Sequence, residues 1–357
     1  MRNVTVIGAG KTGRGFVARL LNEGDVSVNF IDKNEALVEG LRRDGKFTVS
    51  FFGGKREPFE VDRFTVNTWE TAGEIDELVF VSVCGPNLRD VGEALRGRLD
   101  PKKHYYIVTC ENYSHPSRVL REAIGTENIS VSEATVFCTT IENGGYDISS
   151  ENYPYLQCDA ELLEGYDPKI TGIRPISAFG NFLTRKLFTY NAASCVIAYL
   201  GWLRGYSDYG EAANDAEVLE LLDRNYAVTN RVLCREFGYD EKDQAEFAAL
   251  SKAKFTDRTI ADTVARNARE PQRKLGREER VIGPMLVINK YGEDASVLEM
   301  TAAAMLLYDN DGEDAWRAIK ARKTPREILT EIGGLDKDDP AIDRILTYYG
   351  EFSKAKC

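Results

Sequence analysis

The sequence predicts an α/β N-terminal domain with a mostly parallel sheet, followed by an all-α C-terminal domain. Strand and helix signals alternate over residues 1–150, as a parallel sheet with crossover helices requires. After residue 175 the strand signals fade and helical periodicity dominates. A chain of 357 residues is also long for a single hydrophobic core. We therefore place the two domains at residues 1–175 and 176–357.

The predicted elements of the first domain follow in the order that a parallel sheet needs. Short apolar runs predict four strands, at residues 4–7, 26–31, 78–83 and 105–109. Apolar residues on one helical face predict helices at residues 11–22 and 35–43. Residues 142–155 are rich in Gly, Asn, Ser and Tyr and predict a loop.

Two segments illustrate the helical character of the second domain. Residues 216–237 form a long amphipathic pattern that Gly238 stops. Residues 296–308 are strongly apolar and are predicted to be a core helix. The sequence contains no internal repeat and no low-complexity segment.

Composition narrows the class of protein. Hydrophobic residues make up 43% and charged residues 29%, which is ordinary for a globular protein. The net charge of −11 excludes an overall basic surface for nucleic acid. Residues 4–7 are too short for a signal peptide, and no run approaches the ~20 apolar residues of a membrane span. We therefore expect a cytoplasmic protein with neither nucleic acid nor membrane as a partner.

The cysteines and histidines predict no metal site. Seven cysteines are scattered without a CxxC pair, which is typical of free thiols in a reducing compartment. The two histidines, His104 and His115, have no clustered ligand spacing around them.

A glycine pattern joins the first predicted strand to the first predicted helix. It reads Gly8-Ala9-Gly10-Lys11-Thr12-Gly13. In the GxGxxG pattern the first glycine permits a tight turn, the second lets a pyrophosphate approach the backbone, and the third lets the helix pack closely on the strand. The helix N-terminus supplies free N–H groups and a positive dipole end. These six residues are therefore predicted to bind the phosphates of a dinucleotide in a Rossmann domain.

Asp32 predicts which dinucleotide binds. It closes the second predicted strand, 19 residues after Gly13, where a carboxylate binds the adenosine ribose hydroxyls. A carboxylate there repels a 2′-phosphate, so the pattern favours NAD over NADP, although the adjacent Lys33 leaves some tolerance for NADP. The alternative interpretation is a plain turn of glycines with a helix-capping Asp.

Several segments, taken in order, resemble the polyol-specific long-chain dehydrogenase family, in its mannitol-1-phosphate 5-dehydrogenase branch. They are residues 8–16 (GAGKTGRGF), 83–86 (VCGP), 110–112 (CEN), 185–189 (RKLFT), 198–201 (AYLG), 266–275 and 302–305 (AAAM). Of these the RKLFT block is the most specific, and the segments span nearly the whole chain. The resemblance implies an NAD-dependent oxidoreductase that interconverts a sugar alcohol phosphate and a ketose phosphate, of the mannitol 1-phosphate and fructose 6-phosphate type. It also adds Gly85 to the expected cofactor-binding residues.

The resemblance further implies a set of catalytic residues. In that family a Lys, an Asn five residues later and a His three beyond form the active helix, and the Lys is the general base. The matching positions here are Lys186, Asn191 and Ser194, while Asn112 matches a second amide that holds the reacting oxygen with Asn191. On a regular helix at about 100° per residue, Asn191 lies about 140° and Ser194 about 80° around from Lys186, so all three can face one cleft.

The chemistry expected of Lys186 also follows from physical principles. A buried lysine has a depressed pKa and can act as a base near neutrality, and amide donors can stabilise an alkoxide. The alternative for Lys186 is a surface lysine on an amphipathic helix.

Two departures from the family pattern fall in the substrate region. Ser194 stands where the family has His and cannot titrate near pH 7, and Phe137 and Cys138 align with the family's Asp-Arg pair. We expect cofactor binding to survive these changes and the substrate pocket to differ. The open alternatives are a same-fold dehydrogenase for a hexonate, an unphosphorylated polyol or an opine-like imine, and a non-catalytic NAD-binding paralogue.

A basic stretch at residues 266–280 completes the predicted site. Arg273 and Lys274, with Arg269, are predicted to bind a substrate phosphate through charge-assisted hydrogen bonds. The alternative is a solvated basic helix face. The oligomeric state is left open.

Overall fold

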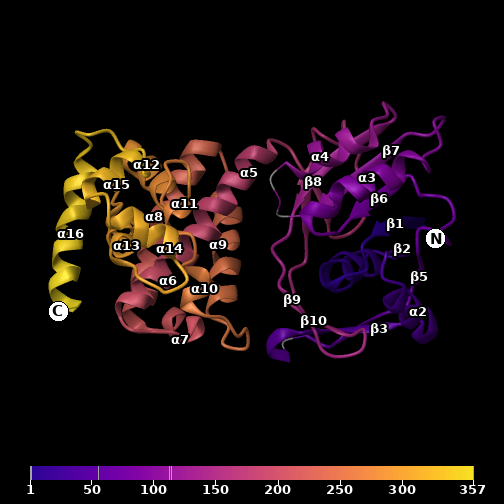
Figure 1. Cartoon of the computed structure of the whole chain (residues 1–357), viewed down its shortest axis with the longest axis horizontal. Coiled ribbons are helices and arrows are strands. Elements are labelled where there is room, and N and C mark those ends of the chain that lie inside the picture. Colours follow the sequence, from indigo (N-terminus) through magenta and orange to yellow (C-terminus); the bar gives the residue numbers. More distant parts are fainter. Residues whose placement is uncertain (1, 55, 112, 114, 357) are drawn as a thin grey trace. The chain divides into compact units, whose positions relative to one another are not determined.

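A computed structural model describes residues 2–54, 56–111, 113 and 115–356 of the chain (Figure 1). The chain divides into two compact units, Met1–Phe182 and Leu183–Cys357. The division falls within helix α5 (Phe179–Lys186), whereas the sequence analysis placed the boundary at residues 175/176.

An eight-stranded sheet forms the centre of the first unit. Its strands are β1 (Arg2–Ile7), β2 (Val26–Ile31), β5 (Phe64–Asn67), β6 (Leu78–Val81), β7 (Tyr105–Cys110), β8 (Ile129–Thr135), β11 (Leu156–Asp159) and β12 (Ile173–Ile176). Their order in the sheet is β12-β11-β8-β7-β6-β1-β2-β5, and only β8 and β11 pair antiparallel. All four residues of β6 are buried, as expected for a strand covered on both faces. The predicted parallel-rich α/β fold is confirmed.

Helices after the strands cover this sheet. They include α1 (Arg19–Glu23), α2 (Glu35–Asp44), α3 (Leu88–Arg96) and α4 (Pro116–Ile124), with the short 3₁₀ turn η3 (Gly85–Asn87). A second 3₁₀ turn, η2 (Phe52–Gly54), follows a strand of the smaller sheet described next. The side chain of Asn34 caps α2 by accepting from the Leu37 N–H, and Gly45 ends the helix at φ 66°. A Cβ at Gly92 of α3 would overlap Ala123 of α4, so the glycine permits the close packing of these two helices.

A second, smaller sheet lies beside the helix that follows β1 (Figure 1). Its order is β4 (Phe59–Val61), β3 (Phe47–Phe51), β10 (Ile148–Ser150) and β9 (Thr140–Glu142). The prediction of a loop over residues 142–155 is therefore wrong where β10 forms. Ile148 packs so closely on Gly15 that a Cβ at the glycine would overlap its side chain.

The second unit is built from helices in the part that the structure describes. They are α6 (Ala192–Leu203), α7 (Tyr209–Ala213), α8 (Ala216–Phe237), α9 (Glu241–Phe255), α10 (Val264–Asn267), α11 (Pro271–Lys274), α12 (Ile282–Lys290), α13 (Ser296–Leu307), α14 (Asp314–Lys320), α15 (Pro325–Glu331) and α16 (Pro340–Lys356). The predicted helix at residues 216–237 has these bounds, with Asp215 capping its start and Gly238 its end.

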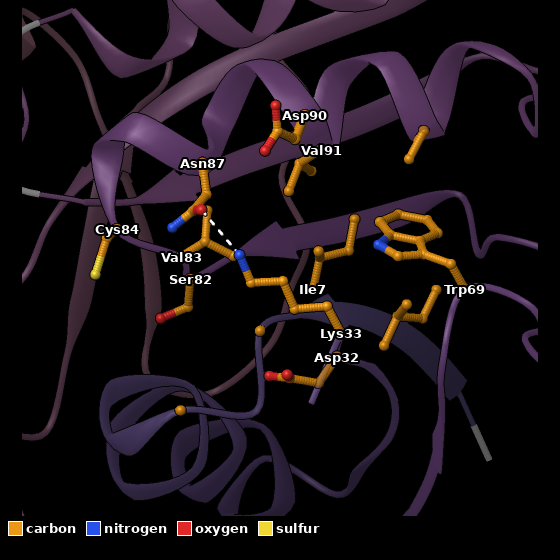
Figure 2. A pocket seen from close by; sticks show the side chains of 14 residues that line it. Ile7, Asp32, Lys33, Trp69, Ser82, Val83, Cys84, Asn87, Asp90 and Val91 are labelled. Atoms are coloured by element: carbon orange, nitrogen blue, oxygen red, sulfur yellow. Dashed lines mark hydrogen bonds between the residues drawn. The ribbon is translucent and has the colours of Figure 1, made fainter. Parts of the chain in front are cut away.

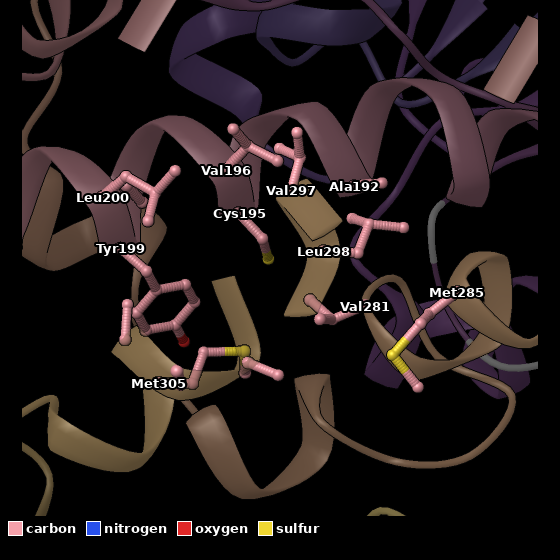
Figure 3. Packing of buried hydrophobic residues seen from close by; sticks show 14 of the residues in the cluster. Ala192, Cys195, Val196, Tyr199, Leu200, Val281, Met285, Val297, Leu298 and Met305 are labelled. Carbon is pink, nitrogen blue, oxygen red and sulfur yellow. The ribbon is translucent and has the colours of Figure 1, made fainter. Parts of the chain in front are cut away.

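Helices α6 and α13 supply the centre of this unit's core. Cys195 and Tyr199 of α6 lie among Val297, Leu298 and Met305 of α13 (Figure 3). The predicted core role of residues 296–308 is confirmed, because nine residues of α13 are buried. None of the described helices is both long and apolar enough to cross a bilayer.

Candidate functional site

The glycine turn after β1 has the geometry that its sequence predicts. Gly8 has φ 98°, and a Cβ there would overlap the Ser82 carbonyl oxygen. A Cβ at Gly13 would overlap the Gly8 carbonyl oxygen. At Gly10 no described atom lies within 4 Å of an added Cβ, so this position is open on its outer side. Gly8 and Gly13 are required by packing, whereas Gly10 leaves room for a ligand.

Asp32 at the end of β2 braces this turn. Its Oδ2 accepts from the Ala9 N–H at 2.7 Å and its Oδ1 from the Asn34 N–H at 2.9 Å. The carboxylate also lines a cavity of about 400 Å³ together with Gly8 and Gly10. Asp32 is therefore placed both to hold the turn and to meet a ligand beside it.

The rest of this cavity combines polar groups with an apolar wall (Figure 2). Lys33 donates from Nζ to the Asn87 Oδ1 at 3.1 Å. Val83 and Cys84, from the VCGP segment of the family resemblance, also line the cavity. The other lining residues, which the sequence analysis did not identify as site residues, are Ile7, Ile31, Trp69, Ser82, Asp90, Val91 and Ala94. Trp69 follows β5, and the end of that strand is the one sequence feature that could have pointed to it. The sequence analysis did not predict β5 and therefore did not identify Trp69.

These residues fit a dinucleotide. The cavity offers a carboxylate for ribose hydroxyls, an open glycine backbone for a pyrophosphate and an apolar wall for a base. Arg14, which is fully buried, supports the turn by donating to the Ala9 carbonyl oxygen and by an ion pair with Glu142 at 3.0 Å. Burial lowers the pKa of Arg14, and the neighbouring carboxylate opposes that shift.

The remaining predicted cofactor residues lie around a second cavity or beside it. Thr12 lines a cavity of about 230 Å³ with Cys110, Glu111, Tyr113 and Val136. Lys11 is exposed, and a Cβ at Gly85 would overlap the Tyr113 ring, which gives this glycine a packing role. Burial raises the pKa of Glu111 to about 7. The predicted catalytic residue Asn112 lies outside the described residues.

In the second unit, Lys186 immediately precedes a π-helical turn and Asn191 is the last residue of that turn. Lys186 ends α5 and precedes η4 (Leu187–Asn191), a π-helix whose following residue, Ala192, donates its N–H to the Leu187 carbonyl five residues earlier. The regular-helix angles assumed from the sequence are therefore wrong here. When the backbone hydrogen bond of a turn spans five residues, side chains five positions apart lie more nearly on the same face of the helix than they do in an α-helix. Such π-turns are often found at functional sites, and the helix after the glycine turn, η1 (Gly13–Ala18), is another.

The surroundings of Lys186 favour its neutral form. Burial of its amine, and then the positive charges of Lys254 and Arg280, lower the pKa of Lys186 to about 7. Lys186 is thus poised to gain and lose a proton near neutral pH.

Ser194 and Lys274 meet at Asn267. The Ser194 Oγ donates to the Asn267 Oδ1 at 3.3 Å, and the Lys274 Nζ donates to the Asn267 carbonyl oxygen at 2.6 Å. Lys274 is buried, and this burial lowers its pKa. Two residues predicted separately, one from the active helix and one from the basic stretch, thus both bond Asn267, one through its side-chain amide and the other through its backbone carbonyl.

The other two predicted phosphate ligands have different surroundings. Arg273 is paired with Glu270 at 2.8 Å and with Glu279 at 3.3 Å. Arg269 is exposed and donates to the Arg266 carbonyl oxygen at 3.3 Å. A phosphate at Arg273 would therefore compete with two carboxylates, and phosphate binding by this stretch stays a prediction.

Phe137 and Cys138 have packing roles in the first unit. Phe137 stacks on Tyr153 with ring centroids 4.9 Å apart, and the Cys138 Sγ lies 3.1 Å from the Ser150 Oγ. Among the described residues, no group of three His, Cys, Asp or Glu side chains could hold a metal ion.

Comparison with known proteins relates this site to a family. Residues 179–344 match the mannitol dehydrogenase C-terminal domain. The chain is 28% identical over 359 residues to a mannitol-1-phosphate 5-dehydrogenase of Anoxybacillus flavithermus, covering 92% of this chain and 93% of the relative. It is 27% identical to the same enzyme of an Exiguobacterium species, covering 85% and 84%.

Solved structures share the fold over the whole chain. A substrate-free D-sorbitol dehydrogenase superposes with a TM-score of 0.76 at 15% identity, covering 99% of this chain and 93% of that one. The mannitol 2-dehydrogenase of Pseudomonas fluorescens, solved as a ternary complex with NAD and D-mannitol, superposes with a TM-score of 0.64 at 12% identity, covering 99% and 92%.

Proposed function

The chain belongs to the mannitol dehydrogenase family, and on this premise we propose that it is an NAD-dependent oxidoreductase that interconverts a sugar alcohol phosphate and a ketose phosphate. The observation that carries the proposal is Lys186, whose pKa of about 7 suits a general base, beside a π turn that ends at Asn191. The curated relatives named above supply the phosphorylated substrate class.

The proposed chemistry assigns a task to each side chain. Oxidising an alcohol requires a proton to leave oxygen while hydride leaves carbon, and the neutral amine of Lys186 accepts that proton. Asn191 would donate a hydrogen bond to the oxygen as negative charge develops on it, and the family resemblance gives the same task to Asn112, which lies outside the described residues. When bound, NAD would supply the hydride acceptor.

Different side chains would hold the cofactor and the substrate. Asp32 would bind the adenosine ribose, and Trp69 and Val91 would contact the adenine. The phosphates would be bound by the residues of the glycine turn, which are Gly8, Ala9, Gly10, Lys11, Thr12 and Gly13. Ser194 cannot exchange protons near neutrality, so it would orient the substrate through its hydroxyl, which Asn267 already engages.

A substrate screen tests the proposal. NADH oxidation would be followed with fructose 6-phosphate, fructose, a keto-hexonate and a keto acid plus amine, each with NADPH as a parallel arm. Turnover that is fastest with a ketose phosphate supports the proposal. Turnover confined to another substrate class identifies a same-fold dehydrogenase, and NADH binding without any turnover identifies a non-catalytic paralogue.

Asp32 is expected to set the cofactor preference. Calorimetric titration of the parent protein should show tighter binding of NADH than of NADPH, because the carboxylate repels a 2′-phosphate. Asp32→Ala should narrow this gap, and it should also loosen the turn, because the Ala9 N–H loses its acceptor. Lys33→Ala is the matched control and should not bring NADPH affinity up to that of NADH. Equal affinities in the parent protein would refute the assignment of Asp32.

The basic stretch is expected to contribute to the binding of phosphorylated substrates and not to that of unphosphorylated ones. An Arg273→Ala/Lys274→Ala double variant should raise KM for a ketose phosphate by more than about tenfold, since a charged hydrogen bond contributes roughly 1.5–3 kcal/mol. Arg269→Ala, tested separately, should also raise KM for the ketose phosphate. KM for the unphosphorylated ketose serves as the control, and an equal rise for both substrates would assign these residues a structural role.

A further inference from the structure

We propose that Gln244, on helix α9, is a positioning residue that holds the π turn between Lys186 and Asn191 and so aligns the two. The inference rests on the proposed function, because it takes Lys186 as the base. Gln244 itself is 59 residues from Arg185 in sequence and belongs to none of the motifs described above.

The contacts of Gln244 fall on both sides of Lys186. Its Oε1 accepts from the Arg185 Nε at 2.7 Å, and its Nε2 donates to the Thr189 Oγ1 at 3.2 Å. Arg185 immediately precedes Lys186, and Thr189 is the middle residue of the π turn. Gln244 and Thr189 are fully buried, so water cannot replace these bonds.

Further contacts between Arg185 and helix α9 also hold the turn in place. The Arg185 guanidinium pairs with the Asp243 carboxylate at 2.7 Å and donates to the Asp243 carbonyl at 2.9 Å. It also lies 4.3 Å from the centre of the Phe247 ring, and Tyr190 of the π turn packs edge-on against the same ring at 5.0 Å. Residues before and within the turn are therefore anchored to one helix.

The anchoring explains why the turn is not a regular α-helix. A π turn is rare and is found mostly as a single insertion, so it needs contacts that favour it over the α-helical alternative. Gln244 supplies such contacts because it fixes the separation of Arg185 and Thr189. Without it, relaxation toward an α-helix would rotate Asn191 and Ser194 around the axis relative to Lys186, which misaligns the amide and the amine.

The charges around Lys186 make this alignment visible in a pH profile. Lys254 lies on α9, Arg280 just before α12, and Arg185 with Asp243 beside the turn, and the first two lower the pKa of Lys186. A change in the position of Lys186 relative to α9 therefore changes the pH at which it titrates.

The test uses the full chain with Gln244→Met, which is similar in size but lacks both polar contacts. We expect kcat to fall roughly tenfold to hundredfold, as for a small misplacement of a catalytic group, and the pH midpoint of the oxidation rate to move, while NADH affinity stays unchanged. Thr189→Val should reproduce part of this effect, and the two changes together should not add. Asn230→Ala is the control, because Asn230 accepts from Gln244 at 2.9 Å but lies outside the turn.

If Gln244→Met does not fold, Thr189→Val and Gln244→Glu, which keeps the acceptor for Arg185, carry the same comparison. Parent-like kcat and pH midpoint in these variants would overturn the inference while leaving the proposed function intact. Full turnover in Lys186→Ala would instead overturn the assignment of Lys186 as the base, and the inference with it, whereas absence of any turnover in the substrate screen would overturn the proposed function.

Discussion

Lys186→Ala is expected to lower kcat by roughly 10²–10⁴-fold, the range by which general-base catalysis contributes. The reason is that the alcohol proton loses its acceptor, while Asp32 and the glycine turn, which would hold the cofactor, are untouched. Steady-state kinetics with the best substrate of the screen, together with NADH titration, separates the two effects.

Lys242→Ala provides the matched control for this prediction. Lys242 is an exposed lysine of the same unit, 4.0 Å from Glu246, and its loss should leave kcat at the parent value. Unchanged turnover in Lys186→Ala would show that the catalytic helix has been misassigned.

Gly10→Val is expected to weaken NADH binding by roughly ten- to hundredfold and to leave the stability of the fold nearly unchanged. No described atom meets a Cβ at Gly10, so the protein tolerates the side chain. A bound pyrophosphate would not, because the valine occupies its approach to the backbone and removes a charged hydrogen bond of roughly 1.5–3 kcal/mol.

Gly13→Ala is the contrasting variant. Its Cβ would overlap the Gly8 carbonyl oxygen, so we expect a lower melting temperature together with weaker NADH binding. Thermal unfolding and calorimetry on both variants separate the two cases. If Gly10→Val binds NADH as tightly as the parent, the cofactor does not approach this turn.

The sequence was most informative where burial enforces a simple pattern. Strand β2 and helix α8 have the bounds predicted for them, because an apolar run and an amphipathic repeat between clear caps leave few alternatives. The resemblance to the polyol dehydrogenases is confirmed at the level of the family. In the second sheet, β4, β9 and β10 were missed because they have only three residues each, too few to show a period. Shortness does not explain β3, whose five residues alternate between buried and half-buried positions and which the sequence analysis also missed.

The geometry of the site depends on contacts that no local pattern carries. The π turn after Lys186 arises where Gln244 grips Arg185 and Thr189 from another helix, so a helical period cannot predict it. Asn267 joins Ser194 to Lys274 in the same way. The low pKa of Lys186 was expected from burial, but the contributions of Lys254 and Arg280 became apparent only with the fold.

The pH dependence of kcat/KM for oxidation of the polyol substrate tests the central claim most directly. Lys186 acts as a base only when its amine is neutral. Because its pKa is about 7, the neutral amine becomes the main form above that pH. We therefore predict that the oxidation rate rises with pH and levels off above about pH 7, that ketose reduction falls over the same range, and that Lys186→Ala loses this transition. A parent profile that is flat from about pH 6 to about pH 8, or a transition that persists unchanged in Lys186→Ala, would contradict the assignment of Lys186 as the general base.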